Sequence, residues 1–230
     1  MAAVPLPKKT LIVINFAALV GLLVINGLSN IKSPLFPNNI GNISNKYPTE
    51  ITPSGPTFAI WGFIYTFQVS WTIYTLTLNC RANAADILPA KFYSFYILSC
   101  VCNITWLFSW VREEFTASLA LLAGTVVTLA ACVFSSSKGL HDYLGKQTKP
   151  NTADVWCVRI LIQNGIIFYN AWVTIATCIN FVVTLHYHCG YDDMCKYLYT
   201  MKLKNKEIIV KDLTFSVSFL FKKPFLRKCI

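Results

Sequence analysis

Aromatic rings and carboxamides recur at helical spacing in three apolar stretches of the chain. Within each stretch they stand three or four residues apart, so on a helix they share one face. The three stripes are Trp61, Tyr65, Gln68 and Thr72; then Asn103, Trp106 and Trp110; then Tyr169, Trp172, Ala176 and Asn180. The chemistry available to such residues is binding, since rings offer flat apolar contact and amides offer hydrogen bonds.

The three amides indicate which way the stripes face. An amide in hydrocarbon needs a partner, so Gln68, Asn103 and Asn180 are expected to turn inward and bond to each other, to backbone or to a ligand. Rings beside them would then line an apolar cavity with a few polar anchors, the usual composition of a small-molecule site. The alternative interpretation is helix packing, with some Trp and Tyr in the interfacial belts of a membrane.

The composition indicates that the apolar stretches lie in a membrane rather than in water. Of 230 residues, 55% are hydrophobic and 13% charged, against about 45–50% and about 25% in soluble domains. The formal net charge of +10 therefore points to a membrane surface rather than to nucleic acid. Most of the nine Cys lie inside apolar runs, which favours small core hydrophobes over a disulfide scaffold.

Five runs without ionisable residues are each long enough to cross a hydrocarbon core of about 30 Å. They predict an all-α integral membrane bundle of five transmembrane helices. The expected helices are about 10–28, 57–79, 92–111, 115–135 and 160–185, in a membrane domain of residues 1–190 followed by a basic tail, 191–230. The first run exceeds the length of a signal peptide core. Basic residues are nearly balanced between the two sides, so the orientation stays open.

The spans contain no Asp, Glu, Lys, Arg or His in their interiors, which disfavours proton relays, ion-coupled carriers and metal-dependent enzymes. His186, His188 and Cys189 have poor spacing for a metal, so neither a metal site nor a cofactor is expected. One further stripe consists of small residues, which predicts close helix packing or a homodimer. Its members are Ala120, Gly124, Thr128 and Ala131.

Three segments resemble the TspO/translocator family, also called tryptophan-rich sensory proteins or peripheral benzodiazepine receptors. Residues 169–181 are similar to its Tyr-x-Ala-Trp-x-x-x-Ala-Thr-x-x-Asn-Tyr pattern, and residues 61–65 to its Trp-x-x-(Leu/Ile)-Tyr. Asn103 and Trp106 match its Asn-x-x-Trp. Phe168 stands where the family usually has Pro, and the 136–159 connection is longer than usual, which indicates a divergent member.

The resemblance implies a five-helix bundle, often dimeric, with a pocket roofed by the loop between the first two helices. Such a pocket accepts tetrapyrroles, sterols or aromatic drug-like molecules. By position, the resemblance places five residues in the pocket lining: Trp61, Asn103, Trp106, Tyr169 and Trp172. Pro53, Pro56 and Phe58 would lie near its mouth. We add Tyr65 and Asn180 to the expected ligand contacts because they belong to the same stripes. A loose sterol motif is formed by Leu185, Tyr191 and Lys196.

The leading hypothesis is a non-enzymatic, multi-pass membrane receptor or carrier for a flat apolar ligand. Its expected partners are membrane lipid, a tetrapyrrole or sterol, and a second copy of the chain, with no nucleic acid. The first alternative is a scaffolding membrane protein whose pocket is vestigial. The second is an enzyme that degrades a tetrapyrrole, which the absence of an acid, base, nucleophile or metal set disfavours.

Overall fold

The computed structural model describes residues 6–31, 36, 38–49, 51–52, 57, 59–81 and 85–188. The chain divides into two compact units, residues 1–184 and 185–230. The helices and the pocket discussed below belong to the first unit. Only residues 185–188 of the second unit are described, and they continue a short π-helix, η3, Thr184–His188.

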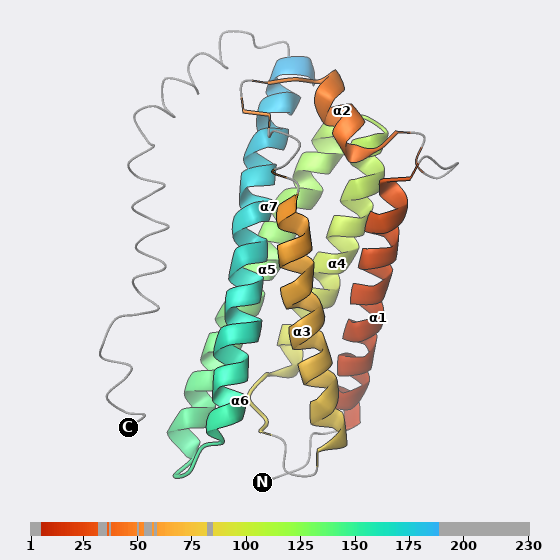
Figure 1. Ribbon diagram of the computed structural model, residues 1–230. Helices are drawn as coiled ribbons and strands as arrows, with labels where there is room; N and C mark the ends of the chain where they lie inside the picture. The colour runs from red at the N-terminus through yellow and green to blue at the C-terminus, as the bar shows by residue number, and fades with distance from the viewer. Residues whose placement is uncertain are drawn as a thin grey trace, which may run out of the picture. The chain divides into compact units, whose positions relative to one another are not determined.

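All regular elements in the described ranges are helical, as the sequence predicts. In chain order they are α1 Leu6–Ser29, α2 Ile40–Lys46, α3 Ile60–Cys80, α4 Ala90–Val111, α5 Phe115–Lys146, α6 Thr152–Cys157, the π-helix η2 Val158–Gln163 and α7 Asn164–Val183. The five long helices, α1, α3, α4, α5 and α7, stand side by side, with α2 at one end and α6 at the other (Figure 1). These ends are called the α2 end and the α6 end below.

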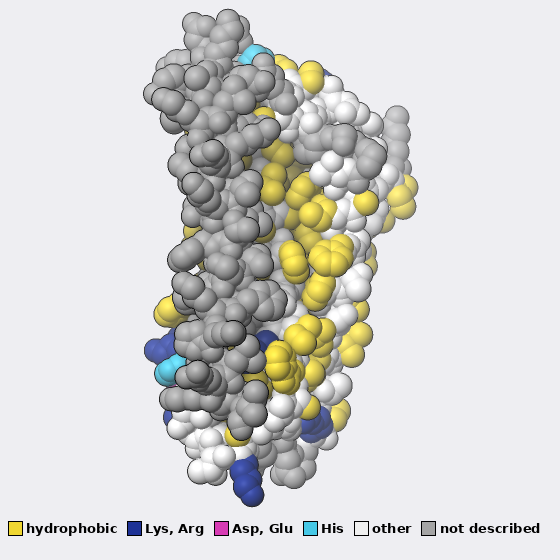
Figure 2. Space-filling view, turned by 60° about the vertical axis from the view of Figure 1, so that its left-hand side comes forward, with side chains coloured by type: hydrophobic (Ala, Val, Ile, Leu, Met, Phe, Trp, Pro, Cys, Tyr) yellow, Lys and Arg dark blue, Asp and Glu magenta, His cyan; other side chains and the backbone are white. Residues whose placement is uncertain are grey.

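Four helical segments are long and apolar enough to cross a membrane, which supports the prediction of an integral membrane bundle. They are Lys8–Ser29, Ala90–Val111, Phe115–Lys146 and Thr152–Tyr187. The remaining long helix, α3, has 21 residues and no charge, but its Tyr, Thr and Gln residues lower its mean hydropathy. Figure 2 shows hydrophobic side chains along the face, while Lys and Arg gather towards one end.

Long helices that follow one another in the chain run in opposite directions, so α1 and α4 run in the same direction (Figure 1). The most extensive contact joins α4 to α5, and α1 packs on α4 while α7 packs on α5. At the α4–α5 contact, a Cβ built on Gly124 would lie 3.6 Å from Cys102 Sγ. The small-residue stripe therefore allows close packing inside the chain at this point, while Ala120, one turn away, is exposed.

Two helices extend beyond the predicted spans. α5 continues from residue 135 to Lys146, and the last long helix begins as α6 and η2, before residue 160. At about 1.5 Å per residue, α5 is about 48 Å long, more than the hydrocarbon core requires. A charge-free run predicts where a helix enters lipid, but a helix can continue into water, where charged residues are solvated.

Ion pairs connect the elements at the α6 end. Arg81, which follows α3, donates to both carboxylate oxygens of Asp154 on α6, at 2.7 and 2.9 Å. The Tyr74 hydroxyl donates to the same carboxylate at 3.0 Å, and Asp154 is buried. Lys8 at the start of α1 pairs with Asp86, before α4. Each of the two charged pairs therefore ties the start or end of a long helix to a neighbouring segment.

Gly139 provides a test of how α5 packs near this end. A Cβ at Gly139 would lie 2.2 Å from the Ile87 carbonyl oxygen, whereas at Gly145, on the same helix, it would meet nothing within 4 Å. We expect Gly139→Ala to lower the free energy of unfolding by about 1–3 kcal/mol through overpacking. Gly145→Ala, the matched control, is expected to raise it by up to about 1 kcal/mol. Thermal unfolding in detergent measures both, and equal melting temperatures would contradict this packing.

Candidate functional site

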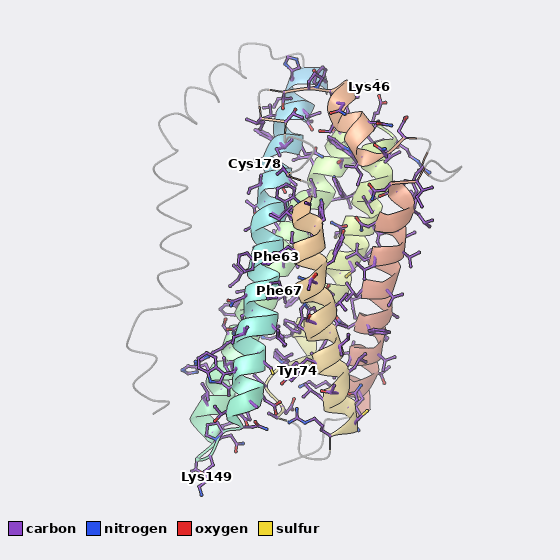
Figure 3. The ribbon with its side chains drawn as sticks, in the orientation of Figure 1. Lys46, Phe63, Phe67, Tyr74, Lys149 and Cys178 are labelled. Atoms are coloured by element: carbon purple, nitrogen blue, oxygen red, sulfur yellow. The ribbon has the colours of Figure 1, made fainter. Side chains whose placement is uncertain are left out.

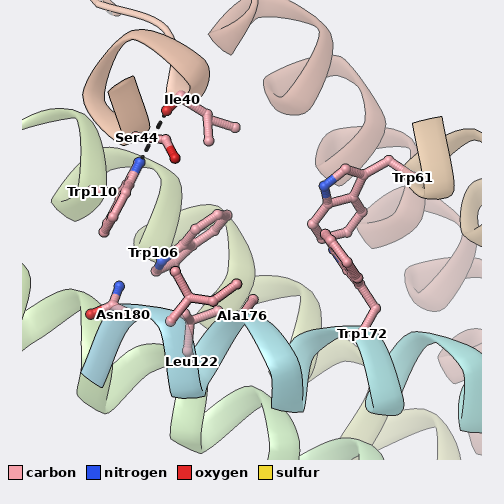
Figure 4. Close-up of a pocket in the computed structure, with 10 residues that line it drawn as sticks. Ile40, Ser44, Trp61, Trp106, Trp110, Leu122, Trp172, Ala176 and Asn180 are labelled. Atoms are coloured by element: carbon pink, nitrogen blue, oxygen red, sulfur yellow. Dashed lines mark hydrogen bonds between the residues drawn. The ribbon is translucent and has the colours of Figure 1, made fainter. Parts of the chain in front are cut away.

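A pocket opens between the long helices near the α2 end (Figure 4). It holds about 480 Å³ of empty space, counting the part that opens to the outside. Its wall contains four indole rings and few polar groups. The lining residues are Ile40 and Ser44 from α2, Trp61 from α3, Trp106 and Trp110 from α4, Leu122 from α5, and Trp172, Ala176, Ile179 and Asn180 from α7.

Ring contacts hold the α3 and α7 sides of this wall. Trp61 lies edge-to-face against Trp172, with ring centroids 6.1 Å apart, and stacks on Tyr65 of its own helix at 5.4 Å. Tyr169 contacts Trp61 edge-on at 6.2 Å. Such aromatic pairs stabilise a fixed arrangement of rings. Trp61 therefore has a defined position, although α3 contributes only this residue to the lining.

The α4 side of the wall continues to the roof of the pocket. Trp106 and Trp110 stack with centroids 6.3 Å apart. The Trp110 Nε1–H donates to the Ile40 carbonyl at 3.4 Å, which connects α4 to α2. α2 lies over this end of the unit (Figure 1) and supplies Ile40 and Ser44 to the lining. The loop that the resemblance places over the pocket thus contributes a short helix to its wall.

The sequence analysis missed α2 because prolines dominate the segment around it. The helix starts at an N-cap, Asn39, whose side chain accepts from the Asn42 N–H at 2.7 Å. An Asn before an apolar residue is the signal that could have located this helix. Just before it, Phe36 stacks on Phe108 of α4 at 4.9 Å. α2 is therefore held by its cap and by aromatic contacts to α4.

A cluster around Glu113 attaches the other end of α2. Glu113 lies in the turn between α4 and α5 with φ of 64°, a conformation that is uncommon for a residue with a side chain. Its carboxylate accepts from Lys46 Nζ at 2.6 Å and from the Tyr47 hydroxyl. These two hydrogen bonds lower the pKa of Glu113, and the bond to Glu113 raises the pKa of Lys46.

The three predicted amides have different partners. Gln68 is buried, donates to the Gly165 carbonyl at 3.0 Å and accepts from Trp71 Nε1 at 2.9 Å. Asn180 donates to Ser118 Oγ at 2.6 Å. Asn103 is fully buried, yet neither its nitrogen nor its oxygen has a hydrogen-bond partner within the described structure. Two of the amides therefore join helices, and the third has no hydrogen-bond partner among the described residues.

Other polar atoms around the pocket are unpartnered as well. The Nε1–H groups of Trp106 and Trp172, both in the lining, have no acceptor among the described residues. The hydroxyls of Tyr65 and Tyr169, which contact Trp61, also lack partners there. A buried polar group without a partner costs about 1–3 kcal/mol, and further unpartnered atoms among the described residues lie away from the pocket, for example on Asn15 and Tyr93.

The structure places the sequence-predicted residues as follows. Trp61, Trp106, Trp172 and Asn180 line the pocket. Tyr65 and Tyr169 contact the Trp61 ring, and Asn103 lies one helical turn before Trp106 on α4. Leu185 is half-buried in the second unit. Pro53, Pro56, Phe58, Tyr191 and Lys196 lie outside the described residues. That these positions bind a ligand stays a prediction.

The pocket also has residues that the predicted set did not include. Leu122 and Ile179 are ordinary apolar residues with no pattern to distinguish them from lipid-facing ones. Trp110 and Ala176 belong to the predicted stripes but were not among the expected ligand contacts. None of the lining residues is ionisable, and the described residues contain no group of three or more His, Cys, Asp or Glu able to hold a metal.

One comparison with known proteins gives a match. A family model described as TSPO-like protein matches residues 12–199. No match was found among curated proteins or among solved structures. The matched region extends from α1 to beyond α7 and contains all the residues that line the pocket. The family pattern thus covers both the bundle and the candidate site.

Glu113 allows a pH test of how α2 is held. Because its pKa is lowered in the folded protein, the Glu113 contact should stabilise α2 above about pH 4.5, the ordinary Glu value, and lose this effect as pH falls through the lowered pKa. Hydrogen-exchange protection factors for α2 should therefore drop below about pH 4.5 in the native protein.

Glu113→Ala should show low protection in α2 already at neutral pH, with no further step on acidification. The matched control is Glu114→Ala, since Glu114 is the exposed neighbouring residue and makes no side-chain hydrogen bond within the described structure. If the two variants give the same protection in α2, Glu113 does not hold it.

Proposed function

Because the chain belongs to the TSPO-like family, we propose that it binds or carries a flat apolar ligand within the membrane, such as a tetrapyrrole or a sterol. Its multi-pass membrane character follows from the family and from the four apolar helical segments. Ligand binding is the step that we add to these findings. The observation that carries it is a pocket with four indoles whose surroundings contain unpartnered polar groups.

The wall suits a flat molecule. Trp61 and Trp172 stand nearly perpendicular, at 87°, so that a ring system can meet the face of one indole and the edge of the other. The lining is mostly apolar, which is typical of small-molecule sites. A few polar groups in an apolar wall would fix the orientation of the ligand.

We propose binding rather than catalysis. A reaction needs a nucleophile, a general acid or base, or a metal at the reacting atoms. Among the lining residues, the Ser44 hydroxyl is the group most similar to a nucleophile, and no base lines the pocket beside it. The resemblance also leads us to expect that the chain forms a homodimer and that a sterol binds at the motif of residues 185–196.

The proposed binding can be tested with indole truncations. We expect Trp172→Ala and Trp106→Ala each to weaken binding of a fluorescent porphyrin about tenfold or more, because each removes a wall of the pocket; tenfold corresponds to about 1.4 kcal/mol. Fluorescence titration in nanodiscs measures the affinity. The matched control is Trp156→Ala, since Trp156 is exposed on α6, at the opposite end of the unit.

Unchanged affinity in both pocket variants, with intact melting temperatures, would show that porphyrins do not bind there. Weakening by Trp156→Ala to the same degree would indicate binding to exposed rings instead. A sterol titration of the same variants applies the same criterion to the other ligand class.

Asn103 distinguishes a ligand-binding amide from a structural one. Since neither amide atom has a partner among the described residues, Asn103→Leu should leave the melting temperature unchanged or raised, because an unsatisfied buried group is removed. The same variant should weaken porphyrin binding about two- to tenfold if a ligand bonds to the amide. Gln68→Leu is the control: it breaks bonds to Gly165 and Trp71 and should lower the melting temperature. Loss of stability in Asn103→Leu without loss of affinity would contradict this role.

A further inference from the structure

We propose that water is bound inside the bundle between α1, α3 and α4, at a site formed by the side chains of Asn15, Thr72 and Tyr93. Each residue belongs to a different helix and is fully buried, and its side-chain polar atoms have no hydrogen-bond partner among the described residues. The site is separate from the indole-lined pocket, because Thr72 follows Trp61 by eleven residues on α3, a rise of about 16 Å.

Two hydrogen bonds fix the level of α1 against α3. Lys9 Nζ donates to the Asn79 carbonyl at 3.4 Å, and Asn79 Nδ2 donates to the Lys9 carbonyl at 3.5 Å. Because α1 and α3 run in opposite directions, Asn15, six residues after Lys9, lies at the level of residue 73 on α3. Thr72 is adjacent to that level, and it shares a helix face with Asn79, seven residues later. Thr72 therefore faces α1 at the level of Asn15.

Ring contacts fix the level of α4 against α3. Trp71, which precedes Thr72, lies edge-to-face against Phe92 and against Tyr96, with ring centroids 5.7 and 4.7 Å apart. Tyr93 lies between these two residues on α4. Two independent sets of contacts thus bring the three unpartnered residues to one level of the bundle.

Other polar side chains on the same helices are satisfied within their own helix. Four hydroxyls of α3 each donate to a backbone carbonyl three or four residues earlier; they belong to Thr66, Ser70, Thr75 and Thr77. On α1, Asn26 donates to the Leu22 carbonyl at 2.9 Å. Thr72 and Asn15 do not make this bond. Their polar atoms therefore need a partner between the helices.

Water matches the chemistry of the three groups. A Thr or Tyr hydroxyl can donate or accept, and an Asn amide donates through its nitrogen and accepts through its oxygen. A buried water makes about three hydrogen bonds, and each of the three helices offers one group. Residues 10–29, 60–80 and 90–111 contain no Asp or Glu, so a metal cation would find no carboxylate among them. Without water, the three groups would stay unsatisfied inside a membrane bundle, which is costly.

The site lies in the part of the bundle nearer the α6 end. Phe67 and Tyr74 mark successive levels of α3 away from the α2 end in Figure 3, and Thr72 precedes Tyr74 by two residues. Tyr93 also interacts electrostatically with Asp86, an exposed residue that precedes α4. The site is therefore close to an end of the bundle where water is present.

Water-edited solid-state NMR of the full-length protein in phosphatidylcholine nanodiscs tests the proposal, because magnetisation passes from water only to nearby protons. With the amide side chains labelled with nitrogen-15, we expect the Asn15 amide to receive magnetisation from water several-fold faster than the Gln68 amide. Gln68 is the matched control, since it is equally buried but bonds to Gly165 and Trp71. The spectrum of Asn15→Leu identifies the Asn15 signal.

Substitutions that keep the shape of the side chain test whether the three helices share the water. Thr72→Val and Tyr93→Phe each remove one hydroxyl and should slow transfer to Asn15 about twofold or more, because the water loses one of about three hydrogen bonds. Thr75→Val is the matched control, since Thr75 is equally buried and its hydroxyl donates to the Thr72 carbonyl. This variant should leave the transfer unchanged. Melting temperatures show whether each variant is folded.

Equal transfer to Asn15 and Gln68 in the native protein would overturn the proposal, whether or not any variant folds. Fast transfer to Asn15 that neither Thr72→Val nor Tyr93→Phe slows would overturn the shared site, since the water would then be bound without the other two helices. Neither measurement involves a porphyrin or a sterol, so its outcome is independent of the proposed function.

Discussion

A polar side chain in the hydrocarbon core of a membrane has no water to bond to, so its partner must come from the protein or from a ligand. This constraint explains the arrangement of the interior. Gln68 binds the Gly165 carbonyl and joins α3 to α7, and Asn180 binds Ser118 and joins α7 to α5. Asn103 sits on α4 in the same interior with no partner in the described structure. Satisfied amides stabilise the bundle, whereas Asn103 is the one for which we propose a ligand as partner.

The pocket has a fixed shape only if the segment that covers it at one end of the bundle is held in place. α2 is this segment, and contacts to α4 and to the α4–α5 turn hold the helix at both ends. At the opposite end of the unit, the buried Asp154 carboxylate ties α3 to α6. The π-helix η2 follows α6 directly, and its wider turns change the direction in which residues of α7 point.

Much of the architecture could be predicted from the sequence because lipid excludes charge. Where ionisable residues are absent for about 20 positions, a membrane helix is the structure that satisfies the backbone, and the long helices lie over the predicted runs. Helical spacing also predicts which residues share a face. The ends of helices were less predictable, as the continuation of α5 to Lys146 shows. α2 was missed because a single N-cap residue gives a weak signal among prolines.

The sequence by itself thus determined the solvent, the helical class and the residues that turn inward, since composition and periodicity act locally along each helix. Only the tertiary structure decided which inward groups meet. Whether Gln68 or Asn103 finds an acceptor depends on the height and rotation of a neighbouring helix, and these follow from packing over the whole bundle. For the same reason, the stripes of Trp61 and Trp172 became two walls of one pocket through the contact of α3 with α7, which no spacing within either helix specifies.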